Sequence, residues 1–452
     1  MSHQTADFTD ATRPTAEVEA GPWSRKAMWT VLAVALVVRV VWLLNVNTMP
    51  VTDFYWYFER AVGIASGEGY SVDGTATAYW PVGYPAFLSV FFRALSPTIT
   101  FAKLRNLLLV LGSIGLTFRL AHRLFHSNAV AVVSALLLSF HLNWIAYTGV
   151  LASEPLYAFL TLWGTWVLLT GGNDKGRWTI GGLLFGLAAL VRPQAVLLPA
   201  IVLWCTSRYD GDVTAPLRLR SAMRAAYFMV ALALIPWAAR NVAVFRAPVV
   251  VTTNMGDNLL IGNNPDATGG YMNPELLGVD FSGMSEPERD SASRKAAVDH
   301  IVSHPWRTVR LWPAKLMNTF GRATDGPYWG FMKVAGQLTV PGAGEDKAQY
   351  LAARSYSAWY HGSLMLLFLV AVPGLALMRR RFGRSLRYPV TGLAMVGYIA
   401  LLSMAFFGNP RFAFPVMPFV SMYAAALLVV AWQSLVPIKD QSPEDDHWGS
   451  GI

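Results

Sequence analysis

Two acidic residues lie beside long apolar runs of the chain and could serve as catalytic carboxylates. Asp53 follows the first apolar run by a few residues and precedes the aromatic stretch 54–58, whereas Glu154 stands between Ser153 and Pro155 at the start of another run. Burial next to hydrocarbon favours the protonated form of a carboxyl group. Such a group can take the proton from an attacking hydroxyl as a general base.

Both acids also have a structural explanation. Asp53 is a suitable N-cap for a helix over the aromatic stretch that follows it. Glu154 would lie in the first turn of a helix capped by Ser153, with Pro155 near its start, where the helix dipole favours a negative charge. Because a cap and a base are compatible roles for one carboxylate, the sequence leaves both explanations open.

Three basic residues near the apolar runs are candidates for binding an anion. Arg192 separates two apolar half-helices, and an arginine there needs either an anion or a path to the membrane surface. A phosphate is its natural partner. Arg411 opens the last apolar run. Lys315 belongs to the basic and aromatic segment 305–315, which could instead contact anionic lipid headgroups.

The composition indicates a membrane protein. Of 452 residues, 54% are hydrophobic and 14% are charged, whereas about 25% of a soluble domain is charged. Several apolar runs reach the roughly 20 residues that a membrane-spanning helix needs. Much of the net charge of +9 lies in short loops between these runs, where basic residues set membrane orientation, so nucleic acid is not an expected partner. The single Cys205 excludes an intramolecular disulfide.

The sequence therefore predicts an all-α polytopic membrane protein with about ten helical passes and a small extracytoplasmic domain. The expected passes cover about residues 28–44, 101–120, 129–147, 154–169, 180–206, 224–239, 358–377, 389–407 and 412–432. Arg25 and Lys26 precede the first pass and favour a cytoplasmic start. Both chain ends are then cytoplasmic, and both Asp53 and Glu154 lie on the extracytoplasmic side of the plasma membrane.

The run 180–206 is expected to form two short arms instead of one pass. A single pass would place the basic loop 208–224 outside and would send the arginine-rich loop 379–387 outside as well. Basic loops favour the cytoplasm, and Pro193 disfavours a helical conformation at Arg192. A hairpin with Arg192 at its outer tip keeps both loops inside, although its arms are too short to cross the membrane fully.

The remaining segments divide by composition. The expected divisions are a disordered cytoplasmic tail (1–24), an N-terminal transmembrane module (25–240) with the first extracytoplasmic loop (48–100), an extracytoplasmic domain (241–355), C-terminal transmembrane helices (356–435) and a second disordered tail (436–452). The tails are polar throughout. A connection as long as 241–355 implies a small domain with its own structure.

Familiar motifs of soluble enzymes do not occur in the sequence. It has no phosphate-binding Gly-Lys-Ser/Thr loop, no His-Glu-x-x-His, no paired cysteines and no Gly-x-Ser-x-Gly. His122 and His126 are four residues apart, but they fall at a predicted helix end where histidine interacts well with the dipole. No metal site and no cofactor is assigned on this basis, and a divalent cation is left open.

The order of several short motifs resembles the GT-C superfamily of polytopic glycosyltransferases. The nearest resemblance is to bacterial relatives of protein O-mannosyltransferases, the dolichyl-phosphate-mannose-protein mannosyltransferase type, and of lipid A aminoarabinose transferase. The matching residues are Asp53, Tyr57, Ala61, Gly67-x-Gly69-Tyr70, Pro81-x-Gly83-Tyr84-Pro85, Ser153-Glu154-Pro155-Leu156, Ala189-Leu190-Val191-Arg192-Pro193, Ile261-Gly262-Asn263-Asn264-Pro265, Ala267-Thr268-Gly269-Gly270-Tyr271 and Asn409-Pro410-Arg411-Phe412 with Pro415 and Pro418. One departure is Trp80-Pro81, where many relatives have two prolines.

This resemblance implies an inverting, single-displacement transfer of a hexose or pentose from a polyprenyl-phosphate donor to a hydroxyl of a protein, lipid or polysaccharide acceptor. It implies Asp53 as the base, Glu154 as the second acid of the site and Arg192 as a contact to the donor phosphate. The further substrate-binding candidates are Lys315, Arg411, Tyr57 and Tyr84. Phosphate is a good leaving group once cations match its charge, so no nucleotide site is needed.

Two other classes of membrane protein fit the composition. A transporter or flippase of lipid-linked saccharides would often show paired repeats with broken helices in matching halves, whereas the broken run at Arg192 has no counterpart. A polymerase or ligase of lipid-linked saccharides would also have a large outer loop, but the early loop that contains Asp53 argues against it.

Overall fold

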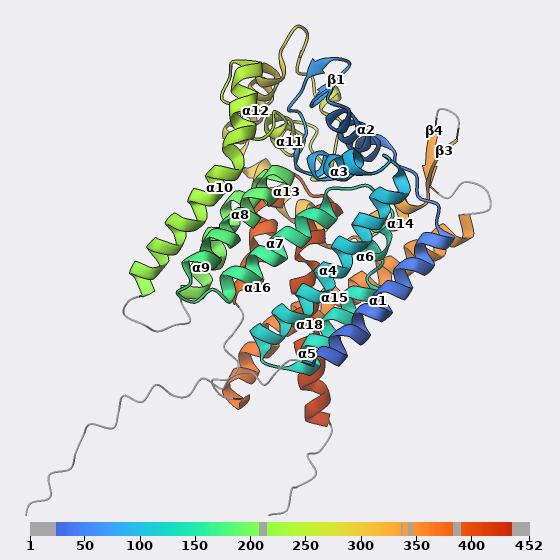
Figure 1. Ribbon diagram of the computed structural model, residues 1–452, viewed down its shortest axis with the longest axis vertical. Helices are drawn as coiled ribbons and strands as arrows, with labels where there is room; N and C mark the ends of the chain where they lie inside the picture. The colour runs from blue at the N-terminus through green and yellow to red at the C-terminus, as the bar shows by residue number, and fades with distance from the viewer. Residues whose placement is uncertain (1–23, 208–214, 336–337, 342–346, 383–389, 436–452) are drawn as a thin grey trace, which may run out of the picture.

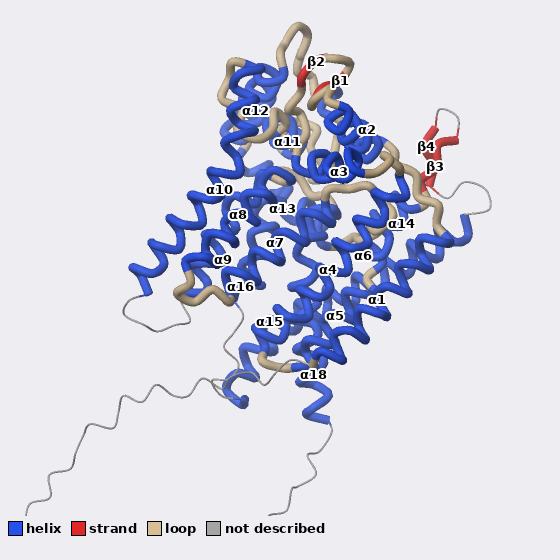
Figure 2. The backbone as a smooth tube through the Cα atoms, in the orientation of Figure 1, coloured by secondary structure: helices blue, strands red, loops and turns tan. Residues whose placement is uncertain are grey.

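The computed structural model describes residues 24–207, 215–335, 338–341, 347–382 and 390–435. The expected disordered tails, apart from Ser24 at the edge of the first, lie outside the described residues, as do loop residues 208–214 and 383–389. Helices dominate the described residues, and Figure 2 shows two small hairpins beside them. The hairpins pair β1 (Ser71–Val72) with β2 (Thr75–Ala76) and β3 (Met332–Ala335) with β4 (Leu338–Pro341). The all-α prediction is confirmed.

A bundle of long helices forms the body of the protein (Figure 1). Its members among the described residues are α1 (Arg25–Asn45), α4 (Ile99–Phe125), α5 (Asn128–Phe140), α7 (Glu154–Leu169), α8 (Lys175–Val191), α9 (Leu198–Ser207), α10 (Ala215–Phe245), α15 (Lys347–Phe382), α16 (Val390–Ala405) and α18 (Met417–Leu435). Five helical stretches within it, in α1, α4, α10, α15 and residues 410–435, are long and apolar enough to cross a membrane. The protein is therefore a membrane protein, and its helices match the expected passes.

The bundle has an apolar outside, and its buried central helix contains a run of small residues. Trp29, Val37 and Leu44 of α1 are 65%, 61% and 80% exposed, which suits a helix that faces lipid. The stretch 410–435 is 89% buried in its apolar window. Three consecutive alanines, 424–426, lie in its buried part, and small residues let neighbouring membrane helices approach closely. α18 is thus the central helix of the bundle.

The run 180–206 is broken where the sequence predicted. α8 ends at Val191, Arg192 has an extended backbone, and a short 3-10 helix (Pro193–Leu197) leads into α9. Proline has no backbone N–H group that could donate a hydrogen bond to the preceding turn, and it restricts the backbone conformation of the residue before it. Pro193 therefore accounts for the break.

The two arms of this run are antiparallel. Arg192 contacts Glu154, so the end of α8 lies beside the start of α7. Arg218 near the start of α10 donates to Asn173, between α7 and α8, at 3.2 Å. α9 must therefore carry the chain from the end of the bundle marked by Arg192 to the end marked by Asn173. The prediction of a hairpin with Arg192 at its tip is borne out by these contacts.

A second layer of short elements covers one end of the bundle, at the top of Figure 1. We call residues 46–98 and 246–335 the cap. Its helices are α2 (Thr52–Ser66), α3 (Gly83–Ala94), α11 (Met255–Gly262), α12 (Glu286–Ser303), α13 (Pro305–Phe320) and α14 (Asp325–Gly330), with a 3-10 helix at Pro274–Leu276. Two short helices of the bundle segments meet the cap from below, α6 (Leu142–Ala146) and α17 (Pro410–Ala413), the latter followed by a 3-10 turn (Phe414–Val416).

Polar contacts join the first loop of the cap to its second segment. The Glu286 carboxylate accepts from the Thr77 hydroxyl at 2.6 Å, from the Ala78 amide at 2.9 Å and from the Thr253 hydroxyl at 2.9 Å. Arg240 at the end of α10 donates to carbonyl oxygens of the same loop. Within the segment 241–355, α10 continues to Phe245 and α15 begins at Lys347. Residues 246–335 share one layer with the first loop.

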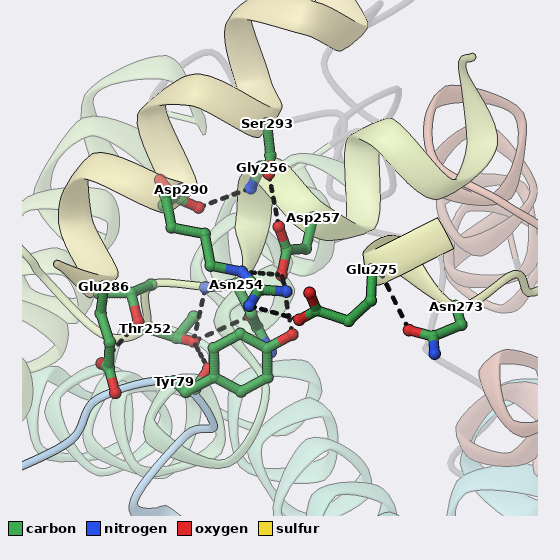
Figure 3. Close-up of polar contacts among 12 residues, drawn as sticks. Tyr79, Thr252, Asn254, Gly256, Asp257, Asn273, Glu275, Glu286, Asp290 and Ser293 are labelled. Carbon is green, nitrogen blue, oxygen red and sulfur yellow. Dashed lines mark hydrogen bonds and ion pairs between the residues drawn. The ribbon is translucent and has the colours of Figure 1, made fainter. Parts of the chain in front are cut away.

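A buried carboxylate organises this layer, and Figure 3 shows the groups that point toward it. Asp257 of α11 accepts from the Tyr79 hydroxyl at 2.9 Å, from the Ser293 hydroxyl at 2.6 Å and from Arg289 at 3.0 Å. Arg289 also pairs with Glu275 at 2.6 Å. Since a buried carboxylate is stable only when its charge is matched, this network fixes the first loop against α11 and α12.

Candidate active site

Two carboxylates and two guanidinium groups meet where the cap contacts the bundle. Arg411 Nη1 donates to Asp53 Oδ2 at 2.7 Å, and Arg411 Nε donates to Glu154 Oε1. Arg192 Nη2 lies 2.7 Å from the same Glu154 oxygen. We call Asp53, Glu154, Arg192 and Arg411 the acid–arginine cluster. Its members come from four distant parts of the sequence, so the fold brings together four of the predicted site residues.

Asp53 lies in the first turn of α2, directly after a residue whose backbone is strained. Thr52, the first residue of α2, has a φ of 52°, a region that β-branched residues rarely adopt and that concentrates at functional sites. Val51 is the N-cap residue of α2, so Asp53 is not the cap. The carboxylate turns to Arg411, and its Oδ1 accepts from the Thr52 hydroxyl at 3.1 Å.

Glu154 is the fully buried member of the cluster. It is the first residue of α7, but Ser153 makes no side-chain capping hydrogen bond to that helix. Two arginines balance the Glu154 charge. A buried carboxylate that lost one such partner would be destabilising, so the pairing, and not a cap, explains why an acid is tolerated at this position.

The two arginines are held by the chain on either side of them. Asn409 accepts from the Arg411 backbone N–H at 3.0 Å and so begins α17. The Arg411 guanidinium lies 4.9 Å from the centre of the Phe54 ring. Arg192 occupies the break that Pro193 makes after α8, and its Nε lies 3.4 Å from the Ser153 hydroxyl.

The two predicted tyrosines have different positions. Tyr57 is buried one turn after Asp53, and burial, reinforced by the Asp53 charge, raises the pKa of Tyr57. Tyr57 therefore stays neutral and can donate a hydrogen bond beside the cluster. Tyr84 packs edge-on against Tyr57 with ring centres 5.7 Å apart, and its hydroxyl donates to Asn106 at 3.2 Å. Tyr84 supports Tyr57 from behind.

Lys315 is directed to another part of the protein. It is fully buried, and its ammonium group donates to Asn263 Oδ1 at 3.1 Å and to the Met404 carbonyl at 3.0 Å. Burial lowers the pKa of Lys315 to about 8. No contact among the described residues joins this ammonium group to the cluster. Its position also differs from the expected contact with lipid headgroups, since the side chain links α13 to α11 and α16.

Asp325 at the start of α14 was not among the predicted site residues, yet it lies close to the cluster. Burial raises the pKa of Asp325 to about 6, and the charges of Arg411, Glu154 and Asp53 also act on it. The available signal was local. Asp325 stands beside Tyr328 and Trp329 outside an apolar run, as Asp53 stands beside its aromatic stretch.

The donor set of the cluster does not fit a divalent cation. Among the described residues, no group of three or more histidine, cysteine, aspartate or glutamate side chains is placed to hold a metal ion. Asp53 and Glu154 both turn toward Arg411. A second cation between them would be repelled by that guanidinium group, so we route no chemical step through a metal.

Comparisons with known proteins give matches in structure only. No protein-family model and no curated protein sequence matches the chain. The match to the oligosaccharyltransferase of Archaeoglobus fulgidus in its apo form covers 91% of this chain and 51% of that protein's chain, with a TM-score of 0.53 at 13% identity. The oligosaccharyltransferase AglB of the same organism, in complex with an inhibitory peptide and a dolichol-phosphate, covers 92% and 52%, with a TM-score of 0.52 at 14% identity.

A third match is weaker. ArnT from Cupriavidus metallidurans bound to undecaprenyl phosphate covers 89% of this chain and 77% of its own, with a TM-score of 0.41 at 14% identity, and we base no argument on it. The first two matches confirm the expected GT-C fold. At their low identity they establish the fold alone, and the chain spans about half the length of the oligosaccharyltransferases that it matches.

Proposed function

We propose that this protein is a membrane glycosyltransferase that moves a sugar from a polyprenyl-phosphate donor to an acceptor hydroxyl on the extracytoplasmic side. The observation that carries the proposal is the acid–arginine cluster, which sets a candidate base beside two cations in a fold of the GT-C type. The alternatives of a flippase and of a polymerase or ligase of lipid-linked saccharides have no such specific support.

The proposed reaction is a single displacement. The acceptor oxygen attacks the anomeric carbon, and the bond from that carbon to the phosphate oxygen breaks. The phosphate leaves with the bonding electrons as polyprenyl phosphate, and the hydroxyl proton passes to Asp53. Attack from the face opposite the leaving group inverts the anomeric carbon. Among the described residues, Oδ1 of Asp53 accepts a hydrogen bond from the Thr52 hydroxyl alone, and this hydroxyl can turn away when an acceptor arrives.

Both arginines keep a donor for the phosphate. Arg192 uses Nη2 and Nε on Glu154 and Ser153, and Arg411 uses Nη1 and Nε on Asp53 and Glu154. No contact among the described residues uses Arg192 Nη1 or Arg411 Nη2. Guanidinium groups suit phosphate oxygens, and fixed cations stabilise the charge that develops on a leaving phosphate.

We propose an orientation in the membrane from the basic residues at the other end of the bundle. The Ser24 amide donates to Asn128, so α1 and α5 start at the same end. The helix ends that flank the short loops at that end carry Lys26, Arg123, Arg177 and Arg218. Because such loops are cytoplasmic as a rule, we place the cluster and the cap on the extracytoplasmic side.

The test is sugar transfer by the purified full chain in proteoliposomes. A radiolabelled polyprenyl-phosphate sugar is supplied, and label in an acceptor fraction is separated from label that has only crossed the bilayer. We expect Asp53→Asn to abolish transfer, because an amide cannot accept the hydroxyl proton. Glu59→Gln, which removes an exposed acid of the same helix, is the matched control and should retain activity. Translocation without product, or full transfer by Asp53→Asn, would contradict the proposal.

A further inference from the structure

The charges of Arg411, Glu154 and Asp53 act on Asp325, which stands on an element that the proposed displacement does not use. The Gly326 amide donates to Asn143 Oδ1 at 2.9 Å, which fixes the start of α14 on α6. One turn later, Trp329 packs edge-on against Phe54 with ring centres 5.0 Å apart. The Arg411 guanidinium group also lies over the Phe54 ring, 4.9 Å from its centre. α14 is therefore fastened to the residue that follows Asp53 and lies on a further side of the same site.

Asp325 also differs from the other acids of the site in its partners. Asp53 and Glu154 each pair with an arginine. Among the described residues Asp325 makes no ion pair, its Oδ2 is buried without a hydrogen-bond partner at bonding distance, and a side-chain hydrogen bond from Tyr147 does not offset the effect of burial on this carboxyl. A buried carboxylate oxygen that lacks a partner disfavours the charged form. The neutral acid, which carries an O–H donor, is the form that this environment favours.

The charges of the site lead to the same conclusion. Arg192 and Arg411 balance Asp53 and Glu154 one for one, so the cluster is neutral as a unit. A phosphodiester donor brings one negative charge. An ionised Asp325 would add a second uncompensated negative charge and repel the phosphate, whereas a protonated Asp325 would attract it as a hydrogen-bond donor.

We propose that Asp325 is a donor-binding residue, whose protonated carboxyl donates a hydrogen bond to the donor phosphate held by Arg192 and Arg411. The inference rests on the proposed function for the identity of the ligand. The inference also predicts proton uptake. When a phosphodiester binds to a protein molecule whose Asp325 is ionised, Asp325 takes up a proton.

This coupling fixes the sign of a pH effect. Burial raises the pKa of Asp325 to about 6, and binding stabilises the protonated form further. Affinity for a phosphodiester is then full below about pH 6 and falls by up to about tenfold for each pH unit above it.

Other titratable groups surround this position and must be separated from Asp325 in the test. They are Asp53 on α2, Glu154 on α7, Arg411 on α17, Tyr147 and His141 on either side of α6, Tyr328 on α14 itself, and Tyr350 and His361 on α15. The two histidines face each other at 3.2 Å. A variant of Asp325 itself distinguishes its titration from theirs.

The experiment measures binding of undecaprenyl methyl phosphate to the full chain in detergent, by tryptophan fluorescence. This phosphodiester keeps one negative charge between about pH 5 and pH 8, so its own titration does not contribute. Wild-type affinity should fall by up to about 100-fold from pH 6 to pH 8. Asp325→Asn should bind equally well at both values, because an amide donates a hydrogen bond without titrating. Asp325→Leu should bind weakly at both.

Two results would overturn the inference and leave the proposed function intact. The first is a wild-type affinity that does not change with pH. The second is an Asp325→Asn variant that keeps the wild-type pH dependence. In both cases Arg192→Gln must weaken binding of the probe at every pH. If Arg192→Gln binds the probe as the wild type does, the phosphate site lies elsewhere, and the proposed function fails together with the inference. Thermal unfolding of each variant identifies any that does not fold, and the isosteric Asn variant keeps the test available if the Leu variant fails.

Discussion

Replacing Glu154 with glutamine should destabilise the protein more than the equivalent change at Asp53. Glu154 is fully buried and pairs with two arginines, whose side chains are 14% and 16% exposed, whereas Asp53 is itself 17% exposed and pairs with Arg411 alone among the described residues. Removing one partner of a buried pair costs about 3–5 kcal/mol, and exposed pairs contribute about 0–1 kcal/mol. We therefore expect a loss of about 3–5 kcal/mol for Glu154→Gln and about 1–2 kcal/mol for Asp53→Asn.

The assay is unfolding in a titration with denaturing detergent, followed by tryptophan fluorescence, with Glu59→Gln as the control for an exposed acid. The loss in Glu154→Gln arises because Arg192 loses its ion-pair partner, while Arg411 retains Asp53. The double variant Glu154→Gln with Arg192→Gln should then be more stable than the sum of the two single losses predicts, with a coupling of about 1–3 kcal/mol. Additive losses, or a Glu154→Gln variant as stable as the wild type, would refute the reasoning that this acid is stabilised by charge pairing.

Three further predictions follow from other parts of the molecule. Sugar transfer should persist after treatment with a chelator, because the carboxylates of the cluster are paired with arginine; loss of transfer that added Mg²⁺ or Mn²⁺ restores would contradict this. Gly262→Ala should lower the thermal unfolding temperature, since a Cβ there would lie 1.7 Å from the Phe406 carbonyl oxygen, whereas Gly362→Ala, with open space around it, should not. Stability should rise as the pH increases from about 8 to about 10, because the unfolded chain binds a proton at Lys315 that the folded protein has released; Lys315→Met should remove this rise in a pH series of unfolding titrations.

The parts of the structure that sequence reasoning predicted depend on local signals. Pro193 breaks the helix through its own ring and through the residue before it, and apolar length identifies the membrane helices without any knowledge of their neighbours. Basic loops fixed the number of passes because their effect depends on charge and position alone. Asp53 and Glu154 were recognisable because each stands at the edge of an apolar run.

The remaining features depend on contacts between distant segments. Lys315 has the appearance of an exposed base in an amphipathic helix, and only the packing of α13 on α16 buries it against Met404. The union of the two cap segments rests on Glu286 and Thr77, which are 209 positions apart. Asp325 is the first residue of α14, a helix of 6 residues, which the contacts of Gly326 with Asn143 and of Trp329 with Phe54 hold in place. Neither hydropathy nor local propensity reports such pairings.

Arg411 connects the stability of the fold to the proposed chemistry. Its guanidinium group joins Asp53 on the cap to Glu154 on the bundle, and it retains Nη2 as a donor for a ligand. A phosphate bound at Arg411 would share this cation with Asp53 and so weaken the hold of Arg411 on that carboxylate. Under the proposed function, donor binding would then loosen the ion pair between Arg411 and Asp53, which leaves the carboxylate oxygens of Asp53 free to accept from an acceptor hydroxyl at the moment when it arrives.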